Sequence, residues 1–262
     1  MNTPPNYLKL LSYNIQVGIG SHRLRHFVTH SWRHVLPHAK SLDNLDKIAK
    51  LIHHYDVVAL QEADAGSLRS SFVNQVEYLA VRGQFPFWCH QINRKIGKFA
   101  QGSNALLSRI PFYAIHDFKL PGFIPGRGAL MVEFGEKSQP LIFIILHLSL
   151  SKRARGLQFG FLKELVNAHE HVIVMGDFNC QPQSREMQRL LKETRLCETT
   201  QPNATFPSWH PVRILDHILT SKNLNVSQAQ VYHYPFSDHL PISMEVEIPP
   251  AINIHVPRMK SA

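Results

Sequence analysis

The sequence predicts an α/β or mixed α+β fold in which two packed β-sheets are covered by helices. Short apolar runs of the kind that form buried strands recur along the chain, and apolar residues at helical spacing precede several of them. In the middle of the chain, candidate strands follow one another with few helices between them, which favours antiparallel pairing there. Two sheets that share one face and lie under helices on the other satisfy both patterns.

Eight apolar segments are predicted to be strands, because each is short and bounded by polar or turn-forming residues. In chain order they are Leu8–Val17, Val57–Leu60, Gln101–Arg109, Ala129–Phe134, Leu141–Leu148, Val172–Met175, Ile214–Leu219 and Ile242–Ile248. Helices are predicted where apolar residues recur at helical spacing. They cover residues 45–52, residues 157–165 and the helix-like stretch Ser184–Leu191.

Length and composition predict one domain. The chain has 262 residues, of which 44% are hydrophobic, and this is enough for one sizeable core. The sequence contains no internal repeat and no Gly/Ser-rich linker. We therefore expect a single domain over residues 1–262, with a core of about 8–248 and a dispensable, proline-bearing tail over 249–262.

Charge and cysteine content narrow the partner and the compartment. The net charge of +9 favours a polyanionic or phosphate-bearing partner, which includes nucleic acid, anionic lipid and small phosphoesters. Cys89, Cys180 and Cys197 are odd in number and lack CxxC spacing, so neither a disulfide framework nor a cysteine zinc site is expected. The N-terminal residues lack a secretory pattern, and no apolar run is long enough to span a bilayer. These features favour a soluble, cytoplasmic protein.

Polar residues stand in or just after many of the apolar runs. They are Asn14, Glu62, His147, Asp177, Asn179, Asp216, Asp238 and His239. Since strand ends line the binding crevice in layered α/β folds, these residues are predicted to converge. Any one of them alone is explained as well by a turn, a surface position or a helix cap, as for Asp177 and Asn179 ahead of Ser184. Their joint occurrence favours a functional site.

The local strings around these residues resemble the endonuclease/exonuclease/phosphatase (DNase I-like) superfamily. The strings are LSYNIQ, VVALQEAD, IILHLSL, VMGDFN, ILDHIL and SDHLP, in this order. A closer resemblance, through LQEADAGSLRS, PGFIPGRGAL and HLSLSKRARGLQ, is to a bacterial subgroup of mostly uncharacterised members, in some bacteria encoded beside cardiolipin synthase. The resemblance implies a four-layered α/β/β/α sandwich and metal-dependent phosphoester hydrolysis.

The resemblance also implies roles for the polar residues. Glu62 would bind Mg²⁺, with Mn²⁺ as an alternative, and Asp238 and Asn14 would complete or flank this metal site. His239 would act as general base or contact the phosphate, and Asp216 would accept from its other ring nitrogen.

Asp177 and Asn179 would position the attacking water and the phosphate. His147 would protonate the leaving group. Arg127, in a Gly-flanked turn, would bind substrate phosphate with Asn14 and Asn179, although a solvated loop arginine is the plainer interpretation.

Three further features bear on specificity. Histidines recur every fourth residue from His22 to His38 and on a helix would form one stripe able to bind zinc adventitiously, but a basic surface insert is the preferred interpretation. Phe123 and Ile124 lie between Pro-Gly breakers, where they can either pack under the loop or reach a membrane interface. Lys152, Arg153 and Arg155 form either a basic rim of the site or a solvated cluster.

The leading hypothesis is a phosphodiesterase or phosphatase acting on a phospholipid-related or small phosphoester substrate. The alternatives are a Mg²⁺-dependent DNA or RNA endonuclease and a non-catalytic phosphate-binding module. Peripheral membrane contact is compatible with the sequence, and no obligate protein partner is predicted.

Overall fold

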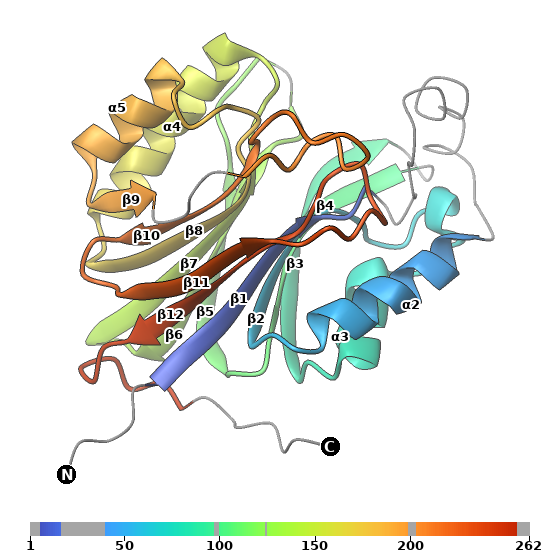
Figure 1. Ribbon diagram of the computed structural model, residues 1–262, viewed down its shortest axis with the longest axis horizontal. Coiled ribbons are helices and arrows are strands. Elements are labelled where there is room, and N and C mark those ends of the chain that lie inside the picture. The colour runs from blue at the N-terminus through green and yellow to red at the C-terminus, as the bar shows by residue number, and fades with distance from the viewer. Residues whose placement is uncertain (1–5, 17–39, 97–99, 124, 199–202, 256–262) are drawn as a thin grey trace.

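The computed structural model describes residues 6–16, 40–96, 100–123, 125–198 and 203–255 (Figure 1). The His22–His38 stretch and Ile124 lie outside the described residues.

Two mixed β-sheets form the centre of the described chain, each with six strands (Figure 1). The first has the order β11-β12-β1-β2-β4-β3, with β1 at Asn6–Asn14, β2 at Val57–Asp64, β3 at Phe87–Ile96, β4 at Ala100–Ser108, β11 at Val226–Val231 and β12 at Ile242–Ile248. The second has the order β5-β6-β7-β8-β10-β9, with β5 at Phe112–Lys119, β6 at Gly128–Glu136, β7 at Gln139–His147, β8 at His171–Asp177, β9 at Leu196–Glu198 and β10 at Asp216–Ser221. Among the described strands, each sheet has one parallel pair: β1 with β2 in the first sheet, and β7 with β8 in the second.

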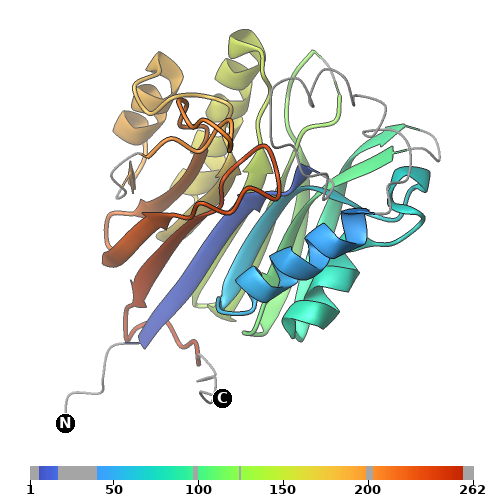
Figure 2. The same cartoon turned by 45° about the vertical axis from the view of Figure 1, so that its right-hand side comes forward.

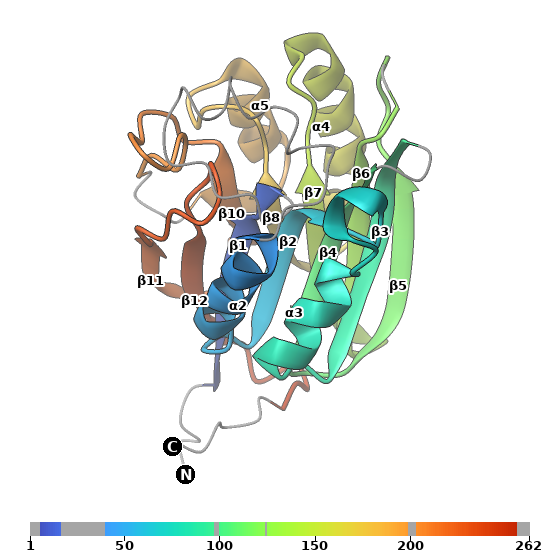
Figure 3. The same ribbon diagram turned by 90° about the vertical axis from the view of Figure 1, so that its right-hand side faces the viewer.

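Helices cover the outer faces of both sheets (Figures 2 and 3). On the first sheet lie α2 (Lys40–Ile52) and α3 (Gln75–Gly83), with the short 3₁₀-helix η3 (Leu68–Ser70) between β2 and α3. On the second lie α4 (Lys152–Asn167) and α5 (Arg185–Glu193). The predicted four-layered α/β/β/α sandwich is thus confirmed.

Strand alternation separates the buried apolar residues into three clusters. In β1, Leu8 and Leu10 belong to the cluster between the sheets, whereas Leu11 and Tyr13 pack under α2 and α3. Strands β7 and β8 divide their side chains in the same way between the inter-sheet cluster and the one under α4 and α5. Because both faces of these strands are buried, they occur in the sequence as nearly continuous apolar runs.

The inter-sheet core continues beyond Ile248, where the sequence predicts it to end. Ile252 and Ile254 are buried in the same cluster. The Asn6 side chain donates to the Ile254 carbonyl at 2.9 Å, and the Asn253 side chain donates to Glu136 at 2.7 Å. Residues 249–255 therefore close the bottom of the sandwich rather than form a dispensable tail, because burying their apolar side chains stabilises the fold.

Within the described residues, no helix is long and apolar enough to cross a membrane.

Gly176 allows β7 and β8 to pair closely just before the strands end. It is paired with Leu146 and has φ +148°. A Cβ atom there would clash with the Leu146 carbonyl oxygen, so β7 and β8 would have to move apart. In contrast, nothing lies within 4 Å of a Cβ added at Gly156, which is exposed in α4.

We predict that Gly176→Ala lowers the free energy of unfolding by about 3 kcal/mol, through steric clash and backbone strain. The matched Gly156→Ala should raise it by about 0.5–1 kcal/mol, because alanine has the higher helix propensity. Urea unfolding followed by circular dichroism measures both changes. A Gly176→Ala protein as stable as the wild type would contradict this account.

Candidate active site

Polar side chains replace apolar ones at one end of the space between the sheets. In β7, residues 141, 143 and 145 belong to the inter-sheet core, and in β8 residues 173 and 175 do so. Since side chains alternate along a strand, His147 and Asp177 face the same space, at the end of their strands. Asp216 begins β10 on the face of Ile218. His147, Asp177 and Asp216 are register partners across the three strands and form one polar row.

The Asp177 carboxylate is the centre of the site. Its Oδ2 atom accepts a hydrogen bond from Asn14 Nδ2 at 3.2 Å. The same oxygen lies 3.3 Å from His147 Nε2 and 3.7 Å from His239 Nε2. Its Oδ1 atom accepts from the backbone N–H of Asn179 at 2.9 Å. Asn14 belongs to the first sheet and Asp177 to the second, so this carboxylate joins the two.

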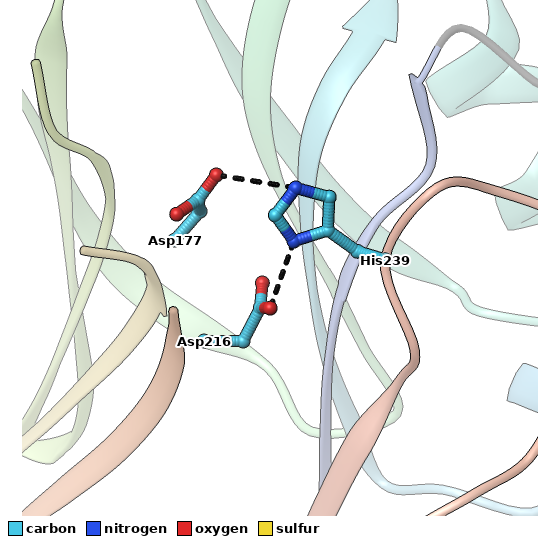
Figure 4. Close-up of side chains that lie close together, drawn as sticks. All are labelled: Asp177, Asp216 and His239. Carbon is cyan, nitrogen blue, oxygen red and sulfur yellow. Dashed lines mark hydrogen bonds and ion pairs between the residues drawn. The ribbon is translucent and has the colours of Figure 1, made fainter. Parts of the chain in front are cut away.

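His239 and Asp216 form a second hydrogen-bonded pair. His239 Nδ1 lies 2.8 Å from Asp216 Oδ2, and its other ring nitrogen points toward Asp177 (Figure 4). The Thr205 hydroxyl also donates to Asp216 Oδ2, and the Phe206 ring lies 4.8 Å from the imidazole. These contacts fix the orientation of a ring that is only 5% exposed.

Glu62 is brought to the site by a bulge in β2. The register of β2 with β4 shifts between Leu60 and Ala63, and Glu62 has φ +58°. A bulge of this kind re-aims a side chain. Glu62 Oε1 lies 3.9 Å from His147 Nδ1, and the side chain is 39% exposed, so that it stands at the mouth of the site.

Asp238 is more deeply buried than Glu62, with 7% of the residue exposed. Its Oδ1 atom is 3.2 Å from Ser237 Oγ, which in turn donates to the Asn14 backbone oxygen at 2.6 Å. Asn14 is thereby held at its backbone by Ser237 and at its side-chain oxygen by the backbone N–H of Gln16.

Burial and mutual repulsion raise the pKa of the central carboxyls. The pKa of Asp177 rises to about 7, mainly through burial and with a further contribution from Asp216 and Glu62, although the charge of His239 opposes the rise. Burial, together with Glu62, raises the pKa of Asp238 to about 6. A site that holds several buried carboxyls at this cost is suited to a cation.

The two histidines differ in charge. Burial, the charge of Arg127 and the charge of His239 hold the pKa of His147 well below its ordinary value. Burial acts in the same direction on His239, but the carboxylates of Asp216 and Asp177 outweigh it and raise its pKa well above the ordinary value. His147 is therefore neutral near pH 7, whereas His239 is an imidazolium.

Arg127 and Asn179 flank this centre. Arg127 is half-buried, and its charge is close enough to His147 to lower the pKa of that ring. The Asn179 side chain donates to the Leu148 carbonyl at 3.0 Å and so holds the chain that follows His147. Neither Asp177 nor Asn179 caps the next helix, because the N-cap of α5 is Ser184.

Two buried amides that the sequence analysis did not single out hold the turn that carries Arg127. Gln91 Nε2 donates to the Phe118 carbonyl at 3.1 Å, and Asn104 Nδ2 donates to the Gly128 carbonyl at 2.9 Å. Both come from the first sheet and reach across to the second. The signal that could have found Asn104 is an amide inside the otherwise apolar strand NALL; Thr205, which orients Asp216, had no such signal.

Two sets of residues in the site can hold a metal ion. Ligand atoms of Asp177, Asp216 and His239 lie within 4.8 Å of one another. In that set, however, Asp216 and His239 are hydrogen-bonded to each other. Glu62 and Asp238 form the second set, in which two carboxylates repel each other and the more exposed one faces the mouth.

Solved structures with the same fold come from several bacteria and beyond. An endonuclease/exonuclease/phosphatase from Beutenbergia cavernae is 18% identical over 92% of this chain and 72% of its own, with a TM-score of 0.73. The mannosyl-6-phosphatase Bt3783 of Bacteroides thetaiotaomicron is 18% identical over 92% of this chain and all of its own, at a TM-score of 0.69. A humanized D. rerio TDP2 is 18% identical over 92% of this chain and 99% of its own, with a TM-score of 0.65.

None of the curated proteins matches the sequence significantly. The family model described as "Endonuclease/Exonuclease/phosphatase family" matches residues 11–239, and this range includes every residue of the site described above. The chain therefore belongs to the endonuclease/exonuclease/phosphatase family.

Proposed function

We propose that this protein is a divalent-metal-dependent phosphoester hydrolase in which water attacks phosphorus beside a His/Asp pair. The observation that carries the proposal is the convergence of Asn14, His147 and His239 on one buried oxygen of Asp177, next to the carboxylates of Glu62 and Asp238. Phosphoester hydrolysis needs charge neutralisation, a proton acceptor for water and hydrogen-bond donors for the phosphoryl oxygens.

The donor set fits a hard divalent cation such as Mg²⁺ or Mn²⁺. Glu62 and Asp238 would hold it, with Asn14 beside them, because these ions prefer carboxylate and amide oxygens and retain several waters. We prefer this set to Asp177, Asp216 and His239, since the 2.8 Å hydrogen bond between Asp216 and His239 would have to break there. When bound, the cation would supply Lewis-acid neutralisation of the phosphoryl charge.

Asp177 is the best-placed proton acceptor. A base acts most effectively when its pKa lies near the working pH, and the pKa of Asp177 is raised to about 7. One proton of the attacking water would pass to Asp177 while the water oxygen bonds to phosphorus and the bond to the leaving oxygen breaks. Asp216 would keep His239 protonated and oriented, so that its Nε2–H donates to a phosphoryl oxygen.

His147 and Arg127 would act on the same phosphate. Because its pKa is depressed, His147 is neutral and would donate an N–H hydrogen bond to the leaving oxygen rather than act as a strong acid. Arg127 presents a planar fork of donors that suits phosphate oxygens. Asn179 would support the loop after His147 and lie beside the phosphate.

For the substrate, we favour a phospholipid-related or small phosphoester. The resemblance of the strand end around His147 supports it, as does the name of one structural relative, a mannosyl-6-phosphatase. A metal-dependent nuclease is the second candidate, because a net charge of +9 favours a polyanion.

A panel of substrates tests the proposal. Purified protein is incubated with plasmid, abasic oligonucleotide, anionic phospholipids and inositol phosphates, with Mg²⁺ or excess chelator. We expect headgroup or phosphate release that chelator abolishes and that His239→Ala lowers by about 10²–10⁴-fold, while His116→Ala, an exposed histidine in β5, leaves it unchanged. Plasmid nicking lost in His239→Ala would favour the nuclease. Hydrolysis that is equally fast in His239→Ala would contradict the proposed site.

Metal binding distinguishes the two ligand sets. We predict that Glu62→Gln weakens Mn²⁺ binding about tenfold or more, measured by calorimetry or electron paramagnetic resonance, because a carboxylate ligand is lost. Asp216→Asn should change the affinity much less. If Asp216→Asn instead weakened binding more than Glu62→Gln, the metal site would be assigned to Asp177, Asp216 and His239. The readout does not depend on turnover.

The raised pKa of Asp177 predicts a pH-dependent stability in metal-free protein. The folded state holds a proton on this carboxyl up to about pH 7, whereas the unfolded chain releases it near its ordinary pKa of 3.8. The contribution of Asp177 to stability is therefore lost as pH rises through this window. Asp177→Asn should gain stability over wild type between pH 4 and 8, on the order of 2–4 kcal/mol.

Urea unfolding in chelator at several pH values measures this difference. The matched control is Asp117→Asn, an exposed carboxylate in β5, whose difference from wild type should stay within about 0.5 kcal/mol. A pH-independent effect of Asp177→Asn would show that the buried carboxylate is compensated in another way.

A further inference from the structure

Two loops at the site end of the molecule expose large apolar side chains. Phe123 lies in the loop between β5 and β6 that also carries Arg127, and it is 63% exposed. Leu150 follows His147 by three residues, in the connection to α4, and is 76% exposed. The Arg153 guanidinium carbon lies 4.8 Å from the centre of the Phe123 ring, so the two loops meet. Figures 2 and 3 show this β5–β6 loop beside the start of α4.

The two chain segments that carry these side chains have charges of one sign. Residues 118–132 and 148–163 contain no aspartate or glutamate. Lys119, Lys152 and Arg153 are exposed within them. Arg155 does not belong to this basic rim, contrary to the sequence-based alternative, because it is buried and bonded to Glu186 at 3.0 Å and to the Leu150 carbonyl.

We propose that Phe123, Leu150, Lys119, Lys152 and Arg153, called here the docking surface, bind the protein to an anionic phospholipid bilayer. Exposed apolar side chains gain free energy when they enter the acyl boundary, and cations beside them bind anionic headgroups. One of these loops carries Arg127 and the other directly follows His147, so docking would place the site against the bilayer. The inference rests on the proposed function in that it names a membrane lipid phosphoester as the substrate class.

The apolar side chains favour a bilayer over a nucleic acid. A phosphate backbone would use the three cations but would gain nothing from an exposed leucine. Charge variants therefore weaken binding to both partners, whereas removal of Phe123 and Leu150 weakens binding to the bilayer alone. The apolar variant is the one that decides between them.

The test is sedimentation of the full chain with vesicles of phosphatidylcholine, with and without about one-third phosphatidylglycerol. Wild type should bind the anionic vesicles, and binding should fall as salt is added. Phe123→Ser/Leu150→Ser should bind the anionic vesicles at least about tenfold more weakly than wild type. In Lys152→Ala/Arg153→Ala, the affinity for anionic vesicles should fall about fivefold for each residue replaced. The matched control is Phe72→Ser/Val81→Ser, which removes side chains that are 64% and 70% exposed elsewhere and should bind as wild type does.

Unchanged vesicle binding in the Phe123→Ser/Leu150→Ser protein would overturn the inference, as would wild type that does not sediment with anionic vesicles. Retention on duplex DNA that depends on Phe123 and Leu150, without vesicle binding, would assign the surface to nucleic acid instead. The assay needs no turnover, so it separates the two proposals. Vesicle binding without any hydrolysis would leave the docking surface standing and count against the proposed function, and hydrolysis without vesicle binding would do the reverse.

Discussion

The buried carboxylate of Asp177 is the group on which the arrangement of the site depends. Burying a carboxylate between two sheets is costly unless donors surround it. Here the donors come from both sheets: the Asn14 amide from β1, and the Asn179 backbone N–H just after β8. The His147 ring, at the end of β7, lies 3.3 Å from the same carboxylate. His239 adds a positive charge. These donors offset part of the cost of burial, which still raises the pKa of Asp177 to about 7, and they join the two sheets at this end.

The position of that carboxylate follows from a change of composition along the strands. The lower part of the inter-sheet space is filled by leucine, isoleucine and phenylalanine, and the upper part by amides, carboxylates and imidazoles. The change occurs without a change of face, since side chains alternate with a period of two residues. Hydrophobic packing below thus holds the polar groups above at fixed separations, as pre-organised catalysis requires.

The loops that leave the same strand ends connect the buried chemistry to the surface. The turn with Arg127 is tied to the opposite sheet by the Gln91 and Asn104 amides, and the chain after His147 is tied down by Asn179. Their outer parts carry Phe123 and Leu150, which are exposed. Rigid bases with exposed tips are suited to present a surface to a partner without moving the residues beneath.

The sequence by itself determined the inner part of the fold. All eight predicted strands are the inner strands of the two sheets, and those it missed, β3, β5, β9 and β11, are the edge strands among the described residues. Inner strands are covered on both faces, and most of their runs are rich in apolar residues, whereas edge strands leave more side chains in contact with solvent, as in β5, where no position is fully buried. Their position in or just after the apolar runs singled out the polar residues of the site, and the resemblance of short strings to a family implied their roles.

Tertiary structure alone decided how those residues meet. The β2 bulge turns Glu62 toward His147, and Thr205 orients Asp216 from the loop before β10. Burial and nearby positive charges keep His147 neutral, whereas carboxylates make His239 cationic. Tertiary packing also buries Ile252 and Ile254 in the core between the sheets. Arg155 is buried as well, where it donates to Glu186. Most of these depend on contacts between segments far apart in the chain, and local composition carries no information about such contacts.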